Sequence, residues 1–111
     1  MLAPNALEMI ITRAICEFDD PVPAATISMY INKITREVRA YTTIKTVLDR
    51  LCDKGILYRR KSGKSFLYGP LTDLDTVCIQ RIRYINQKLY GGDGWDTIIA
   101  LCQKAKLEDA K

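Results

Sequence analysis

The length, composition and charge of the chain restrict its possible functions. Its 111 residues, 48% hydrophobic and 27% charged, suffice for one compact core with an accessory element but not for a second enzyme domain. The chain has no histidine, and no serine, threonine or cysteine stands in a recognisable nucleophile motif, so hydrolytic and acyl-transfer chemistry loses its support. Its apolar runs are short and interrupted by charge, which predicts neither a signal peptide nor a membrane span. We expect a cytoplasmic protein that is not an enzyme.

The net charge of +4 is distributed unevenly along the chain. Residues 36–64 contain nine basic and three acidic side chains, a net charge of +6, whereas the remaining residues have a net charge of −2. A basic middle between mildly acidic ends is typical of a protein with one surface that faces a polyanion. An ordinary solvated surface is the alternative that charge alone leaves open.

The four cysteines are too far apart in sequence for a metal site built from neighbouring residues. They are separated by 36, 26 and 24 positions: Cys16, Cys52, Cys78 and Cys102. Each falls on the apolar stripe of a predicted helix, where a free cysteine behaves as a small hydrophobic residue, and a redox or metal role is the alternative. We therefore expect no disulfide, no metal and no cofactor.

The first part of the chain reads as two short helices. Apolar residues at steps of three and four over residues 7–18 predict the first, and Asn5 with Glu8 suggests a capping box at its start. Acidic residues and prolines interrupt the pattern at residues 19–23. The periodicity restarts around Thr26, a candidate N-cap or first-turn residue, as a second helix of about ten residues.

A third predicted helix, near residues 41–54, is the candidate functional surface. Its apolar positions are Ile44, Val47, Leu48 and Leu51. Burying them leaves short hydroxyl side chains near the start of the opposite face and longer charged ones further along, a surface that can enter a major groove. Gly55 after Lys54 predicts a left-handed C-terminal cap.

Residues 56–68 have the pattern of a β-hairpin, with aromatic residues at period two and a turn at Ser62 and Gly63. Several basic side chains lie close together at its tip, where they do not contribute to packing of the core. Phe66 and Tyr68 share one strand face, and we expect both to pack on the helices; stacking on bases is the alternative.

The C-terminal part is predicted to form two helices, over residues 73–90 and from residue 95 to about 106. Glycines separate them, and each has a narrow apolar stripe. Roughly forty residues rarely sustain a core alone, so we expect this pair to pack against the same element of a second chain. Packing onto the first three helices is the alternative.

The stretch AYTTIKTVLDRLCDKGILYRRKSGKSFLY, continuing into GPL, resembles the penicillinase and methicillin-resistance repressor family, the BlaI/MecI/CopY type. A weaker similarity runs through YINQKLYGGDGWDTIIALC, which resembles that family's dimerisation helices. The resemblance implies a mainly α fold with a small β-hairpin. In such a fold, residues 1–70 would form a winged helix-turn-helix DNA-binding domain and residues 71–111 a helical dimerisation element. It further implies a homodimeric repressor on an inverted-repeat DNA operator with TACA- and TGTA-like half-sites.

The family resemblance and the charge pattern together suggest the site residues. Base reading is assigned to the start of the third helix, with Thr43 and Thr46 as first choices: Tyr41, Thr42, Thr43, Lys45 and Thr46. Phosphate and wing contacts are assigned to Arg39, Arg50, Arg60, Lys61 and Lys64. Dimerisation is assigned to the apolar stripes: Leu74, Cys78, Ile82, Ile85, Leu89, Trp95, Ile98 and Ile99.

Two departures from the family limit what transfers. Copper-sensing members have a Cys-x-Cys pair near the C-terminus, where this chain has only Cys102, so copper sensing is not expected. Members inactivated by proteolysis are cut at an Asn-Phe bond in the fifth helix, where this chain reads Leu101-Cys102. A protein-interaction module on the same fold, without operator specificity, is the alternative function.

Overall fold

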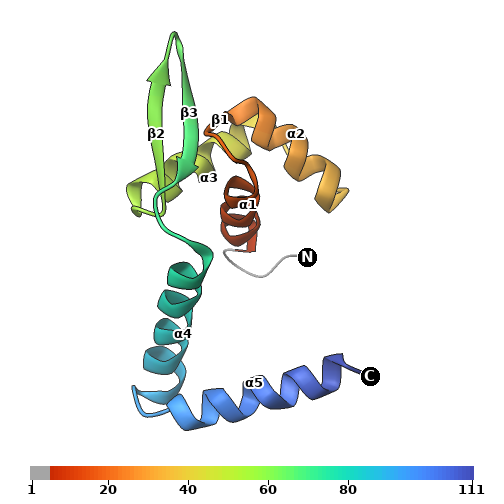
Figure 1. The fold of residues 1–111 in the computed structure, drawn as a ribbon, viewed down its shortest axis with the longest axis vertical. Helices are drawn as coiled ribbons and strands as arrows, with labels where there is room; N and C mark the ends of the chain where they lie inside the picture. Colours follow the sequence, from red (N-terminus) through yellow and green to blue (C-terminus); the bar gives the residue numbers. More distant parts are fainter. Residues whose placement is uncertain (1–5) are drawn as a thin grey trace. The chain divides into compact units, whose positions relative to one another are not determined.

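The computed structural model describes residues 6–111, which form five helices and one three-stranded sheet (Figure 1). The helices are α1 (Ala6–Glu17), α2 (Ala24–Thr35), α3 (Tyr41–Asp53), α4 (Leu74–Tyr90) and α5 (Trp95–Asp109). The strands are β1 (Val22–Pro23), β2 (Leu57–Ser62) and β3 (Ser65–Pro70). Every helix expected from periodicity is present. In this described part of the chain, no helix is long and apolar enough to cross a membrane.

The chain divides into two compact units, Met1–Leu74 and Asp75–Lys111. The boundary falls slightly after the one drawn from the sequence at residue 70. Strand β3 continues to Pro70, and the Leu71 N–H donates to the Ile56 carbonyl at 3.0 Å. These contacts keep the residues after the hairpin attached to the first unit.

The core of the first unit lies between α1, α2, α3 and the sheet. The third helix buries the four residues that its periodicity predicts, and β2 and β3 contribute one large side chain each, Leu57 and Tyr68. Among the described residues 6–111, the buried hydrophobic ones are Ile11, Ala14, Ile15, Ala24, Ile27, Ile31, Ile44, Val47, Leu48, Leu51, Leu57 and Tyr68. Full burial of each large side chain stabilises the fold by about 1.5–3 kcal/mol.

Glu8 joins the beginning of α1 to the end of α3. Its side chain is 4% exposed, and its two carboxylate oxygens accept hydrogen bonds from Lys54 Nζ at 3.1 and 2.9 Å. Arg50 Nη1 lies 3.6 Å from the same carboxylate. The sequence suggested a capping role with Asn5, which lies outside the described residues, but not this ion pair between helices.

The beginning of α2 and the end of α3 agree with the sequence analysis. Helix α2 begins at Ala24, directly after Pro23, so Thr26 lies in its first turn rather than at its N-cap. At the end of α3, Gly55 has a φ of 75° and its N–H donates to Cys52, while the Ile56 N–H donates to Leu51, both at 3.0 Å. This pair of bonds is a Schellman motif and confirms the left-handed cap.

The hairpin belongs to a sheet that the sequence did not predict in full. The strand order is β1-β3-β2, with all neighbours antiparallel and Val22 opposite Tyr68. Strand β1 was expected to be only a break between helices; it has two residues, and its Pro23 suits an edge strand. The turn consists of Gly63 and Lys64, one residue later than expected, and Gly63 has the positive φ of 62° that its first position requires.

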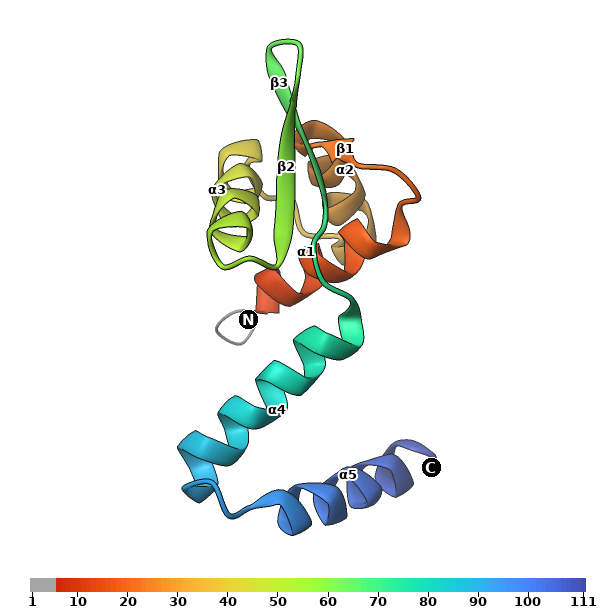
Figure 2. The same ribbon diagram turned by 60° about the vertical axis from the view of Figure 1, so that its left-hand side comes forward.

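Only one of the two aromatic residues on the β3 face packs in the core. Tyr68 is 1% exposed, whereas Phe66 is 36% exposed, so the prediction that both pack on the helices was wrong for Phe66. Phe66 lies two residues nearer the hairpin tip, and the hairpin projects past the helices of its unit (Figure 2). The Arg59 guanidinium covers its ring instead, 5.2 Å from the centroid.

In the second unit, a buried amide organises the turn between α4 and α5. Asn86 is 4% exposed; its side chain donates to the Gly92 carbonyl at 3.1 Å and accepts from the Gly94 N–H at 2.7 Å. Gly91 and Gly92 have φ values of 63° and 95°, which only glycine adopts readily. The turn is therefore held by a polar side chain that no apolar pattern indicated.

Candidate nucleic-acid interface

Helix α3 presents an exposed face made mainly of threonines. Tyr41, Thr42, Thr43 and Thr46 are all exposed. Thr42, Thr43 and Thr46 line a shallow depression of about 390 Å³ together with Val47 and Arg50. The structure thus brings together three of the five residues assigned to base reading and places a cation next to them, whereas Tyr41 lines a different pocket.

Thr46 is oriented by its own helix. Its hydroxyl donates to the Thr42 carbonyl at 2.8 Å, one turn earlier. The donor of this hydroxyl is therefore occupied, while its oxygen lone pairs and its methyl group remain for other contacts. A threonine held in this way is suited to accepting a hydrogen bond from a base amino group or to contacting a thymine methyl.

The fifth residue assigned to base reading, Lys45, belongs to a cluster centred on Asp49. One carboxylate oxygen of Asp49 accepts from Lys45 Nζ at 2.8 Å; the other accepts from Arg59 Nη1 and from the Tyr68 hydroxyl, both at 2.8 Å. Lys45 Nζ also lies 5.8 Å from the centroid of the Tyr68 ring. We call these four residues the Asp49 cluster; it connects α3 with β2 and β3.

The cluster shifts the protonation equilibria of its members toward the ion-paired form. Burial acts to raise the pKa of Asp49, but the hydrogen bonds from Lys45, Tyr68 and Arg59 outweigh it and lower the pKa below its usual value. The bond to Asp49, followed by the interaction with Tyr68, raises the pKa of Lys45. Burial is the main cause of the raised pKa of Tyr68. All three residues therefore keep their neutral-pH protonation states.

The basic tip of the hairpin is open on both faces. Arg60, Lys61 and Lys64 are exposed, and within the described residues none of them forms an ion pair. Lys61 is opposite Phe66 and Arg59 is opposite Tyr68, so Lys61 shares the strand face that holds the Asp49 cluster. Arg60 projects from the other face.

The two remaining cations assigned to phosphate differ in their surroundings. Arg50 is 52% exposed, although it also approaches Glu8. The Arg39 side chain is only 11% exposed; its guanidinium donates to Thr35 Oγ1 at 3.2 Å and to Glu37 Oε2 at 2.9 Å. Arg39 therefore organises the loop between α2 and α3, and any phosphate contact by it would compete with Glu37.

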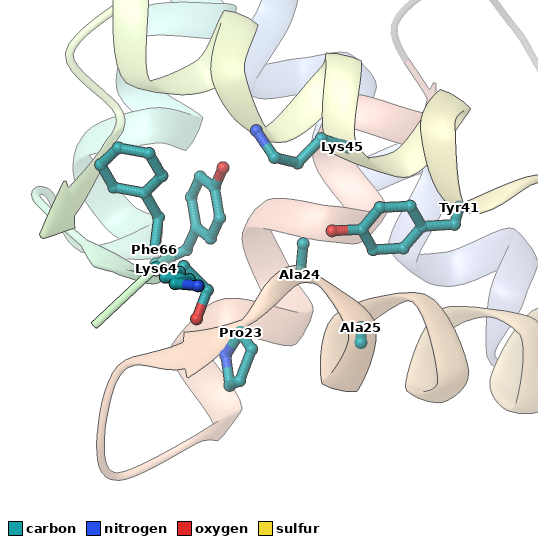
Figure 3. A pocket seen from close by; sticks show the side chains of 9 residues that line it. Pro23, Ala24, Ala25, Tyr41, Lys45, Lys64 and Phe66 are labelled. Carbon is teal, nitrogen blue, oxygen red and sulfur yellow. The ribbon is translucent and has the colours of Figure 1, made fainter. Parts of the chain in front are cut away.

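A pocket of about 490 Å³ opens beside the start of α3 (Figure 3). One wall is the start of α2, the second is α3, and the third is the hairpin. The lining residues are Pro23, Ala24, Ala25, Tyr41, Lys45, Lys64, Ser65, Phe66 and Tyr68. Sequence reasoning missed this pocket, because it depends on the unrecognised strand β1 and on the exposed position of Phe66.

The residues assigned to dimerisation lie on α4 and α5 and are largely uncovered in the single chain. Leu74, Cys78, Ile85, Leu89, Trp95 and Ile99 are exposed, and Ile82 and Ile98 are partly exposed. Within the second unit, only two residues are buried: Asn86, whose side chain is polar, and Gly94, which has no side chain. This unit therefore has apolar surface but no apolar core of its own.

The cysteines are free thiols. Cys16 and Cys52 are partly buried, and burial raises the pKa of both, so they stay protonated near neutral pH. Cys78 and Cys102 are exposed on α4 and α5.

We predict that Asp49→Asn weakens the junction between α3 and the hairpin. The substitution removes the charge that pairs with Lys45 and Arg59, and we expect urea unfolding followed by circular dichroism to show a decrease of about 1 kcal/mol in the free energy of unfolding at pH 7. Because the native pKa of Asp49 lies below its usual value of 3.8, its contribution is present above that pH and is lost as the pH falls through the native pKa. The two proteins should therefore converge in strong acid.

Asp53→Asn is the matched control, because Asp53 lies on the same helix but is exposed and outside the cluster. It should change the free energy of unfolding little at any pH. Equal stability of the native protein and Asp49→Asn from neutral pH down to pH 3 would show that the cluster contributes nothing.

The comparisons with known proteins agree with this geometry. The family model of the penicillinase repressor matches residues 5–111. A search of curated proteins finds no significant match. Among solved structures, the fold is similar to the DNA-binding domain of the repressor BlaI, with a TM-score of 0.54 and 24% identity over 67% of this chain and 84% of that one. It is also similar to the transcriptional regulator Tm0710 from Thermotoga maritima, with a TM-score of 0.51 and 17% identity over 96% of this chain and 79% of that one.

These matches confirm the expected winged-helix fold, in which the β2–β3 hairpin is the wing. The family model spans nearly the whole chain. The chain therefore belongs to the penicillinase repressor family, a non-enzymatic family of DNA-binding transcriptional regulators.

Proposed function

We propose that this repressor binds an inverted-repeat DNA operator as a homodimer, with α3 in the major groove and the β2–β3 wing on the adjacent backbone. The observation that supports this best is the threonine face of α3 next to an exposed basic wing within one compact unit. The family resemblance favours an operator with TACA- and TGTA-like half-sites. Occupying such a site in a promoter would block transcription.

In this proposal, the start of α3 reads base edges. Thr43 and Thr46 are exposed and short, so their methyl groups can meet thymine methyls and their oxygens can accept from base amino groups. Tyr41 and Thr42 are the first two residues of α3. In helix-turn-helix proteins the N-terminal residues of the recognition helix are the ones that contact base edges. Lys45 uses one of its three donors for Asp49, and its remaining donors would make the contact with a base. Each good base contact contributes about 1–3 kcal/mol of discrimination.

The long cations supply contacts that do not depend on sequence. Lys61 and Lys64 project from the wing without ion-pair partners among the described residues, and Arg50 flanks the threonine face. Arg60, on the other wing face, and Arg39, in the loop before α3, complete the proposed set. Each phosphate neutralised releases counterions, which makes binding weaken steeply with salt.

Homodimerisation is proposed to occur through α4 and α5. Their exposed stripes give the second unit an apolar surface that it cannot bury by itself. A second copy of the same stripe would cover it, and a two-fold dimer would match the symmetry of an inverted repeat. Cys78 lies within this proposed seam as a small apolar residue.

Selection of bound duplexes from a random DNA pool tests the proposal directly. We expect enrichment of an inverted repeat whose half-site spacing reports the dimer geometry. Thr43→Ala and Thr46→Ala should each relax the preference at particular positions of the half-site, whereas Thr97→Ala, on α5, should leave it unchanged. Weak binding without sequence preference would instead support the protein-interaction module.

We predict that replacing Arg60, Lys61 and Lys64 together with alanine weakens binding to every duplex. For the homodimer, the slope of log K against log salt should flatten by about five units, because six phosphates, three per subunit, are no longer neutralised by the protein. Binding is measured by fluorescence anisotropy over a range of salt concentrations. The control replaces Lys104, Lys106 and Lys111 with alanine, which removes the same charge from the other unit. An unchanged slope in the wing variant, with its fold intact by circular dichroism, refutes the wing assignment.

We predict that Ile85→Asp converts the protein to a monomer. Ile85 is exposed in the single chain, so the substitution spares the first unit's core, but it places a charge in the proposed apolar interface. Sedimentation equilibrium measures the mass, and Ile82→Asp should give the same result. Gln80→Asp adds the same charge on the opposite face of α4 and should leave the dimer intact. A dimer that survives both isoleucine substitutions places the interface elsewhere.

A further inference from the structure

We propose that the pocket beside α3 binds a small organic anion with a flat apolar body and one carboxylate. The pocket is enclosed by the start of α2, by α3 and by the wing, all within the first unit. Its volume of about 490 Å³ lies in the range of roughly 300–1,000 Å³ typical of small-molecule sites. This site and its ligand go beyond operator binding.

The walls of the pocket favour an apolar and flat ligand. Tyr41 points into it from α3, on the side opposite Phe66 of the wing, and Pro23 and Ala24 form the floor between them (Figure 3). Phe66 is a large aromatic residue that the core leaves 36% exposed. A ligand ring against Phe66 and Tyr41 would remove apolar surface from water and add aromatic contacts.

The charges around the pocket favour an anion. Lys45 and Lys64 line it, and none of its lining residues within the described chain is acidic. Asp49 occupies one donor of the Lys45 ammonium, which has three, so the lysine stays charged and in place while further donors remain available. Lys64 lies in the wing turn, and its ammonium forms no ion pair with the described residues.

The start of α2 adds to this positive potential. Pro23 is its N-cap and provides no side-chain hydrogen bond, so the first N–H groups of α2 have no side-chain cap. Ala24 and Ala25, the first two residues of α2, are among the residues that line the pocket. A carboxylate is therefore favoured over a neutral polar group by two lysines and one helix end.

The proposed ligand would compete with DNA. Tyr41, Lys45 and Lys64 line the pocket and are also among the residues proposed to contact the operator. A ligand that occupies them lowers operator affinity, and by reciprocity DNA lowers ligand affinity. A ligand bound in the pocket would thus release the repressor from the operator by occupying residues that contact DNA. This last step, unlike the binding itself, rests on the proposed function.

The first experiment measures binding without DNA. The full chain labelled with ¹⁵N is titrated with 2-naphthoate, with the neutral 2-naphthalenemethanol and with inorganic phosphate, and chemical shifts are followed by NMR. We expect saturable shifts around Tyr41, Lys64 and Phe66 for naphthoate, and binding at least about five-fold weaker for the neutral analogue. Equal binding of both aromatic probes, or no saturable shift with naphthoate, overturns the proposal. Saturable binding of phosphate at the same residues, equal to that of naphthoate, also overturns it and makes the pocket a simple anion site.

Two variants and a control locate the site. Lys64→Ala should weaken naphthoate binding about five-fold, whereas Lys61→Ala removes the same charge from the same hairpin outside the lining and should change it less than about two-fold. Ala25→Trp fills the pocket from an exposed position and should abolish the shifts while the fold stays intact by circular dichroism. Equal effects of Lys64→Ala and Lys61→Ala would show that binding reports only net charge.

The second experiment tests competition on the selected operator. Naphthoate at about ten times its dissociation constant should weaken operator binding by the homodimer about a hundred-fold, because both subunits must lose the ligand, and the residual operator binding of Ala25→Trp should not respond to naphthoate. A ligand that binds the free protein but leaves operator affinity unchanged overturns the competition alone. If no operator is found, the first experiment still decides whether the pocket binds the anion.

Discussion

The placement of α3 against the β2–β3 wing depends on the carboxylate of Asp49. It accepts three hydrogen bonds from three elements: Lys45 on α3, Arg59 on β2 and Tyr68 on β3. In the proposed function, the spacing between α3 and the wing must match a DNA groove and its backbone, and that spacing is held by charged hydrogen bonds as well as by packing. Such bonds are directional, so they limit sliding that an apolar contact would permit.

Two acids form ion pairs with some of the basic side chains in the middle of the chain and leave the others exposed. Asp49 holds Lys45 and Arg59, while Glu8 holds Lys54 and approaches Arg50. Part of the net charge of +6 on residues 36–64 is therefore unavailable for contact with a polyanion. The basic side chains that remain unpaired among the described residues are concentrated at the wing, which supports the proposed phosphate contacts there and the proposed base contacts of the threonine face of α3.

Periodicity and turn chemistry sufficed to predict the helices, the Gly55 cap and the hairpin, because these depend on neighbours in sequence. The sequence could not predict strand β1, since two residues that include Pro23 have no period. Phe66 and Tyr68 were indistinguishable on one strand face, because the length by which the wing projects depends on tertiary packing. The Asp49 cluster and the pocket were missed for the same reason: both unite residues from separate elements. The roles assigned to α3, the wing and the apolar stripes stay predictions.

The turn at Asn86 has a consequence for assembly. A buried amide and left-handed glycines determine how α5 leaves α4, so in the proposed dimer each chain would meet its partner with these two helices already joined in a defined corner. Less conformational entropy would then be lost on association, which would favour the dimer. Affinity for a second subunit would then be tunable from position 86, a site inside the corner rather than on its apolar stripes.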